Sequence, residues 1–231
     1  MQMPEPDAAI IAKRPDIIDQ LNRIVPAGPF GSNVITDPDG LKAYECDGLS
    51  AYRQLPMVVV LPETTAQVSE ILKYCLGAGV KVVARGAGTS LSGGALPLAD
   101  GIMVGLGKFN SVLDIDYANR AVVTQPGVTN LAISEAVADH GFYYAPDPSS
   151  QIACSIGGNI AENSGGVHCL KYGLTTNNVL GVEMVLINGD VIRLGGKHLE
   201  SEGYDLLGLV TGSEGLLGII TEVTVRILRQ P

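Results

Sequence analysis

The spacing of apolar residues along this chain is helical in some segments and extended in others, and this spacing predicts the secondary structure of each segment. Helical spacing occurs in residues 15–25 (PDIIDQLNRIV) and in 68–76, within the segment TTAQVSEILKYCLGAG. Short runs rich in β-branched residues, 57–60 (MVVV) and 80–84 (VKVVA), flank the second helix and predict strands. A strand, a helix and a strand in this order predict two parallel strands.

The helix between these strands has start and stop signals. Thr64 or Thr65 can cap its first turn, because a hydroxyl there accepts a hydrogen bond from an otherwise unpaired N–H. Gly77 and Gly79 are expected to end it.

The middle of the chain predicts strands at 101–109, 111–116 and 120–127, and then a helix over 129–141. Beyond this helix, the prolines at 146 and 148 exclude a helix and predict a long loop. Long loops inside compact domains carry function more often than short ones, so a ligand is expected here.

The last third predicts mainly antiparallel structure. Alternating strands over 179–194 surround Asn188-Gly189, which predicts a hairpin with a two-residue turn. A short helix over 205–210 and a glycine turn are expected next, and residues 217–229 (LGIITEVTVRILR) predict one long strand. A parallel start with an antiparallel finish predicts the α+β fold class.

Composition and charge narrow the function. The chain has 231 residues, 46% of them hydrophobic, which is enough for one large domain or two small lobes with a core. Its formal net charge is −9 and it has no Lys or Arg run, so we expect no nucleic-acid partner. We also expect no signal peptide or membrane span, because no apolar run reaches about eighteen residues. The four cysteines lack metal-ligand spacing, which predicts reduced thiols, no metal site and a cytoplasmic protein.

Residues 85–94 (RGAGTSLSGG) directly follow a predicted strand. This placement favours a loop whose backbone N–H groups bind phosphate oxygens. The stretch does not match the Rossmann fingerprint, since the third glycine is displaced to Gly93 and Gly94, and it lacks the Lys-Ser/Thr pair of a Walker A loop. The alternative is a plain glycine-rich turn.

Two later glycine clusters are also candidates. In residues 156–166 (IGGNIAENSGG) the glycines permit close backbone approach, and the hydrogen-bonding side chains are Asn159, Asn163 and Ser164. Such a set suits a heteroaromatic ring, and the alternative is a tight helix packed against a sheet. In residues 211–220 (TGSEGLLGII), Glu214 can accept from a ribose or ribityl hydroxyl, or cap the turn.

Three stretches, in this order, resemble the FAD-binding domain of vanillyl-alcohol-oxidase or PCMH-type flavoproteins. They are RGAGTSLSGG, residues 146–196 (beginning PDPSSQIACSIGGNIAENSGG) and residues 203–225 (GYDLLGLVTGSEGLLGIITEVTV). The resemblance runs from about residue 40 onward and includes the FAD-linked large subunits of glycolate oxidases, with D-lactate and D-2-hydroxyglutarate dehydrogenases as near relatives.

The resemblance implies a two-lobed α+β domain that holds FAD between its lobes. Residues 1–50 would form a helical arm and 51–231 the FAD-binding domain. Within that domain, a small mixed α/β lobe would cover about 51–109, and a larger, mainly antiparallel lobe with helices about 110–231.

The resemblance also implies which residues contact FAD. The first stretch would bind the diphosphate through N–H groups and hydroxyls, the second would line the isoalloxazine and ribityl chain, and the third would lie near the ribose and adenine. The implied cofactor-binding residues are Arg85, Gly86, Ala87, Gly88, Thr89, Ser90, Pro146, Asp147, Ser149, Ser155, Gly158, Asn159, Asn163, Gly165, Gly166, Glu214, Gly218, Ile219 and Ile220. For Arg85 we favour a phosphate contact over a side chain that only extends to solvent.

The implied chemistry is oxidation of a 2-hydroxy acid, glycolate or D-lactate, to the 2-oxo acid. Flavin N5 takes a hydride from the α-carbon while a base takes the hydroxyl proton. Family members draw the catalytic histidine and the carboxylate-binding basic residues from a second domain, which this sequence lacks, so no catalytic residue is named here. The resemblance also implies an iron–sulfur partner subunit as the electron acceptor. No cluster-binding cysteine spacing occurs in this chain, so the cluster would belong to that other chain.

The histidines and cysteines have secondary roles in this interpretation. For His168 we expect a ring contact or no role, in preference to covalent attachment of the flavin. His140 and His198 are expected to meet solvent. Cys154 and Cys169 flank the ring-lining segment, and we expect inert thiols there.

Two other functions remain open. The chain could hold FAD or a nucleotide without turnover, or it could be a subunit-contact protein whose flavin site is only structural. Bound flavin separates the last from the others, and reduction by a hydroxy acid separates an enzyme from a binding module.

Overall fold

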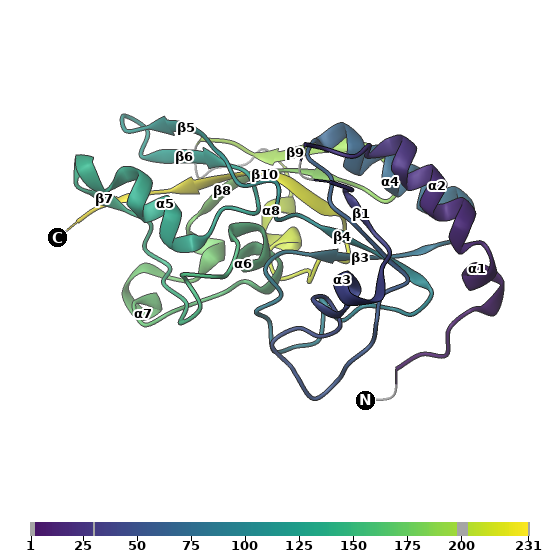
Figure 1. Ribbon diagram of the computed structural model, residues 1–231. Coiled ribbons are helices and arrows are strands. Elements are labelled where there is room, and N and C mark those ends of the chain that lie inside the picture. Colours follow the sequence, from purple (N-terminus) through teal and green to yellow (C-terminus); the bar gives the residue numbers. More distant parts are fainter. Residues whose placement is uncertain (1–2, 30, 198–202, 231) are drawn as a thin grey trace. The chain divides into compact units, whose positions relative to one another are not determined.

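The computed structural model describes residues 3–29, 31–197 and 203–230. The chain divides into two compact units, each with its own sheet (Figure 1). The first comprises Met1–Lys108 and Leu186–Asp190, and the second comprises Phe109–Val185 and Val191–Pro231. Within the described ranges, no helix is long and apolar enough to cross a membrane.

The first unit contains a four-stranded sheet in the order β1-β2-β4-β3. Its strands are β1 (Val34–Ile35), β2 (Val58–Val60), β3 (Lys81–Arg85) and β4 (Gly101–Gly105). Strands β2 and β3 are parallel, as predicted, but each pairs with β4, which lies between them. Strand β1 adds an antiparallel edge to β2, so the sheet is mixed.

Four helices belong to this unit: α1 (Ala8–Ala12), α2 (Arg14–Ile24), α3 (Pro38–Lys42) and α4 (Thr65–Ala78). Helices α2 and α4 lie side by side (Figure 1). The Thr64 hydroxyl caps α4 by accepting from the N–H of Gln67 at 3.2 Å. Gly79, with φ +69°, ends it, whereas Gly77 lies inside the helix and does not end it as expected.

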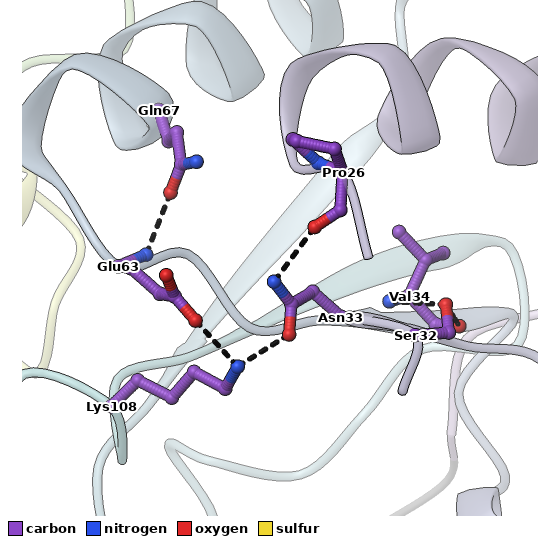
Figure 2. A network of polar contacts seen from close by, with 7 residues as sticks. All are labelled: Pro26, Ser32, Asn33, Val34, Glu63, Gln67 and Lys108. Carbon is purple, nitrogen blue, oxygen red and sulfur yellow. Dashed lines mark hydrogen bonds and ion pairs between the residues drawn. The ribbon is translucent and has the colours of Figure 1, made fainter. Parts of the chain in front are cut away.

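A polar network holds the N-terminal segment against this unit. Figure 2 shows the ammonium group of Lys108 between the side chains of Asn33 and Glu63, with 2.6 Å from Nζ to Glu63 Oε1. The Asn33 amide donates in turn to the carbonyl of Pro26 at 2.9 Å. The network therefore joins the chain after β4, the entry to α4 and the chain after α2.

The second unit contains a five-stranded antiparallel sheet in the order β5-β6-β10-β8-β9. Its strands are β5 (Val112–Asp116), β6 (Ala121–Thr124), β8 (Val179–Val185), β9 (Val191–Gly195) and β10 (Ile219–Arg226), and its helices are α5 (Asn130–Val137), α6 (Ile156–Glu162), α7 (Cys169–Tyr172) and α8 (Leu206–Val210). Helices α5 and α6 lie on the same side of this sheet (Figure 1). The antiparallel finish predicted from the sequence is thus present.

The final strand is shorter than predicted. Strand β10 ends at Arg226, opposite Ala121 at the start of β6, so the ladder with β6 extends no further. The N–H of Ile227 then bonds to Arg120 O at 2.9 Å, and β11 (Leu228–Arg229) pairs with β7 (Phe142–Tyr143). The predicted single strand is two strands in different sheets.

The hairpin of β8 and β9 is confirmed, but its turn has three residues and not two. Leu186 N–H donates to Asp190 O, and Gly189 N–H donates to Leu186 O. Gly189 has φ +85°, whereas Asn188 is not in the left-handed region that a two-residue type I′ turn requires at both positions. The result is a type I turn followed by a glycine bulge.

The tip of this hairpin belongs to the first unit because it binds α4. The buried hydroxyl of Ser69 donates to Gly189 O at 2.6 Å, and the aliphatic part of Lys73 packs over Gly189. One hydrogen bond and one apolar contact therefore hold the tip on α4.

Replacing Ser69 by alanine should lower the free energy of unfolding by about 1–2 kcal/mol, because the buried carbonyl of Gly189 loses its donor. Urea unfolding followed by circular dichroism measures the change. Exposed Ser149 provides the control, and Ser149→Ala should change stability by less than about 0.5 kcal/mol. Equal stability of the two variants would show that the tip is not anchored by this bond.

The hydrogen bond and charge of Lys108 lower the pKa of Glu63 below its ordinary value of 4.5. A lowered folded-state pKa stabilises the protein above the unfolded-state pKa, and this contribution is lost as the pH falls through the folded-state value. Glu63→Gln should therefore lower the thermal midpoint more at pH 7 than at pH 3. Glu135→Gln, at an exposed position, is the control, and a pH-independent difference for Glu63→Gln would contradict the assignment.

Candidate functional site

The glycine-rich loop begins where β3 ends, and Arg85 turns beneath it. The guanidinium donates to Ala95 O at 3.2 Å and lies 5.8 Å from the centre of the Tyr44 ring. Burial lowers the pKa of this guanidinium, and the nearby Asp47 carboxylate opposes that shift. These contacts make Arg85 a support of the loop, and its direct contact with phosphate stays a prediction.

Two glycines keep side chains out of the space around this loop. Gly88 has φ +68°, and a Cβ at this position would collide with the guanidinium of Arg85. On the other side, a Cβ on Gly48 would lie 2.7 Å from Ser90 O and 2.8 Å from Thr89 O. Sequence reasoning missed Gly48, because a lone glycine between Asp47 and Leu49 gives no sign of a distant contact.

The loop leaves its main-chain donors available. Within the described residues, none of the N–H groups of residues 87–91 donates a hydrogen bond to a protein acceptor. Ser90 and Ser92 share a hydroxyl contact of 2.7 Å, and Thr89 is exposed. Consecutive unpaired N–H groups on a glycine loop after a strand are a donor set that fits a diphosphate.

In the second unit, the N-terminus of α5 holds the long loop that contains Pro146, Asp147 and Ser149. The buried side chain of Asn130 donates to Pro146 O at 2.9 Å, and its main-chain N–H donates to Cys154 O at 3.1 Å. Asn130 therefore fixes both ends of a loop that has few internal hydrogen bonds. Sequence reasoning missed this residue, because a lone asparagine beside a helix cap is common.

Asp147 connects this loop to the next glycine cluster. Its two carboxylate oxygens bind His168, one at 2.6 Å from Nδ1 and the other at 3.2 Å from the main-chain N–H. Gly166 packs so closely on Asp147 that a Cβ there would collide with it. The ring of His168 is 61% exposed, so it is oriented by Asp147 and still open to a ligand.

His140 meets solvent as expected, whereas the inertness of the two cysteines stays a prediction, and only Cys154 has the burial expected of both. His140 is exposed and stacks on Tyr117, with 4.3 Å between the ring centres. His198 lies outside the described residues. Cys154 is buried and Cys169 is half-buried, and neither is part of a disulfide.

The cluster 156–166 begins as helix α6, the alternative that the sequence left open. Ser155 caps the helix by accepting from Gly158 N–H at 3.4 Å, and Gly157 packs so closely on Pro126 that a Cβ there would lie 2.6 Å from the proline Cβ. Asn163, with φ +49°, ends the helix, and its Oδ1 accepts from Thr176 N–H at 3.0 Å. In the described chain, the buried Nδ2 of Asn159 has no hydrogen-bond partner.

The loop with Glu214 closes the other end of α6. The N–H groups of Gly212 and Glu214 donate to the carbonyls of Ile160 and Ala161, each at 2.8 Å. Glu214 adopts φ +55°, and its exposed side chain remains available to a hydroxyl group. The structure thus gives its main chain the capping role and leaves the ribose contact a prediction.

Further along, Gly218 precedes β10, whose first two residues are Ile219 and Ile220. A Cβ on Gly218 would lie 2.6 Å from Val185 O, and the side chains of both isoleucines are buried. Only main-chain atoms at these two isoleucines can therefore face a ligand.

The predicted site residues form one group in each unit. The group in the first unit lies at the end of β3 and in the loop that follows it, and comprises Arg85, Gly86, Ala87, Gly88, Thr89 and Ser90. The remaining residues belong to the second unit. Among the described residues, no group of three His, Cys, Asp or Glu side chains is arranged to hold a metal ion.

Known proteins are similar to this chain in sequence and in fold. The family described as FAD binding domain matches residues 56–195. The glycolate oxidase subunit GlcD of Escherichia coli (strain K12) is 57% identical over 201 residues, which are 87% of this chain and 40% of that protein. The D-lactate dehydrogenase of Archaeoglobus fulgidus is 40% identical over 215 residues, which are 92% of this chain and 46% of that protein. The chain thus spans less than half the length of these relatives.

A solved structure of alkyldihydroxyacetonephosphate synthase matches with a TM-score of 0.81. It is 20% identical in sequence, and the match covers 99% of this chain and 42% of that one. The likeness confirms the predicted α+β fold class.

Gly88→Val should abolish FAD retention while the protein stays folded, because valine is strained at φ +68° and collides with Arg85. The flavin that remains after desalting measures retention, and far-UV circular dichroism checks the fold. Gly77→Val is the matched control, since the space around Gly77 in α4 is open. Unchanged flavin content in Gly88→Val would contradict the diphosphate assignment.

Proposed function

Because the chain belongs to the FAD binding domain family, we propose that it is the cofactor-holding part of an oxidoreductase that oxidises a 2-hydroxy acid. The observation that carries this proposal is the set of free main-chain donors at residues 87–91, above the buried guanidinium of Arg85. Such a loop replaces side chains with backbone against the two phosphates of FAD.

The second unit would supply the contacts with the remainder of FAD. The unpaired Nδ2 of Asn159 is a donor suited to a ring carbonyl or nitrogen. Glu214 offers a carboxylate to a ribose or ribityl hydroxyl. Bound FAD supplies a hydride acceptor, and the protein's tasks are to bind and orient it.

We assign glycolate or D-lactate as the substrate, supported by the names of the relatives, a glycolate oxidase subunit and a D-lactate dehydrogenase. The relatives are more than twice as long as their matched parts. We therefore assign the general base and the carboxylate-binding residues to a second domain outside this chain, and the electron acceptor to an iron–sulfur partner subunit. The four unpaired cysteines support a reducing compartment, the cytoplasm.

An absorption spectrum from about 300 to 550 nm tests the proposal, because bound FAD absorbs in this range. After FAD addition and desalting, the chain should retain flavin. Its loss would contradict the proposed function.

Anaerobic glycolate or D-lactate should bleach this flavin only when the second domain is present. Bleaching by the chain alone would contradict the assignment of the base to that domain. Retained flavin that no hydroxy acid bleaches, even with the longer protein, would favour the alternative of a binding module without turnover.

A further inference from the structure

Residues 165–173 of the second unit form a loop whose two ends lie close together. The two ends meet at Ser164 and Thr175, where the Thr175 N–H and hydroxyl both donate to Ser164 O, at 3.0 and 2.8 Å. Thr175 is fully buried. Two hydrogen bonds from one buried threonine therefore hold the two ends of the loop together.

The return side of the loop is held by Asn178, whose side chain is fully buried. Its Nδ2 donates to Tyr172 O at 3.0 Å and to Leu174 O at 2.8 Å. Its Oδ1 accepts from Arg226 Nη2 at 3.0 Å, and its main-chain carbonyl accepts from the Arg226 N–H at 2.8 Å. Asn178 thus ties two carbonyls of the loop to strand β10.

These two carbonyls stand on either side of Gly173. Gly173 has φ +79° and ψ −177°, a region that glycine occupies readily and other residues do not. A Cβ there would collide with Asn177, whose Oδ1 accepts from Leu174 N–H at 3.0 Å. Because glycine has many conformations open to it, the amide of Asn178 selects this one by binding the carbonyls on both sides.

The loop that these bonds hold carries several candidate flavin contacts. It contains Gly165 and Gly166, and His168, which is bound to Asp147. At its far end, the Tyr172 ring meets the edge of Tyr143, with 6.2 Å between ring centres. The two glycines, the imidazole and the Gly173 turn thus share one loop.

We propose that Asn178 is a positioning residue for FAD: its carboxamide fixes the turn at Gly173 and so holds residues 165–172 in place for the isoalloxazine. This inference rests on the proposed function. It assigns a role to a residue that is buried beneath the site and does not itself contact the cofactor.

The chemistry of a carboxamide is what this position requires. Two N–H donors serve two carbonyls while one oxygen accepts from arginine, in a single planar group. Aspartate has the same shape and keeps the contact with Arg226, but it would present an acceptor to both carbonyls. Asn178→Asp therefore removes the two bonds to the loop and preserves the bond to β10.

Asn178→Asp should weaken FAD binding about tenfold or more and leave ADP binding within about twofold, because ADP lacks the isoalloxazine and ribityl groups. Calorimetry measures both dissociation constants, and visible circular dichroism of the bound flavin should change. The matched control is Asn22→Asp, since Asn22 also donates to a main-chain carbonyl but on the exposed side of α2. Equal weakening of FAD and ADP, or of neither, would overturn the proposal.

Hydrogen exchange in the unaltered chain supplies a test that does not depend on the variant folding. Without FAD, the amides of residues 171–175 should already be protected, since they bond to His168, Cys169, Asn177 and Ser164. Complete exchange there within seconds would overturn the inference. Failure of the unaltered chain to bind FAD would instead contradict the proposed function, so the two failures are distinguishable.

Discussion

The packing of the Arg85 guanidinium against Gly88 is the constraint on which the shape of the glycine-rich loop depends. The guanidinium occupies the space that a side chain at position 88 would need, and φ +68° at this residue favours glycine. Gly48 packs against the carbonyls of Thr89 and Ser90, and within the described residues the N–H groups of residues 87–91 have no protein acceptor. The diphosphate contacts that we propose for this loop therefore come from backbone, and Arg85 supports the loop.

In the second unit, asparagine and threonine side chains hold irregular segments in shape. Its candidate flavin-binding segments are mostly irregular, and irregular backbone needs partners for its carbonyls when it is buried. Asn130 supplies a donor to Pro146, Thr175 to Ser164 and Asn178 to the turn at Gly173. These buried amides and hydroxyls give the loops fixed shapes without regular secondary structure.

Local sequence signals predicted the parts of the fold that local physics determines. Helix α4, its threonine cap, the β8–β9 hairpin and the glycine loop after β3 could all be read from spacing and turn chemistry. The place of β4 between β2 and β3 could not, because strand order depends on contacts between distant segments. The three-residue turn at Gly189 also escaped prediction, since Gly189 binds Ser69 of α4, which lies far away in the sequence.

The candidate site was predictable to a similar extent. The resemblance of three stretches indicated the segments, but it could not separate residues that would face FAD from those that shape the loops. The structure gives shaping roles to Arg85, Ser155 and the main chain of Glu214. Asn130 and Asn178 gave no sequence signal, because a buried asparagine is recognisable only from the distant carbonyls that it serves.

A crystal structure of the chain with FAD tests the central claim most directly. The account predicts that diphosphate oxygens lie within about 3.2 Å of main-chain nitrogens in residues 87–91, a hydrogen-bond distance, with Arg85 unmoved beneath them. A diphosphate bound elsewhere, or held by side chains while these nitrogens remain unpaired, would contradict it.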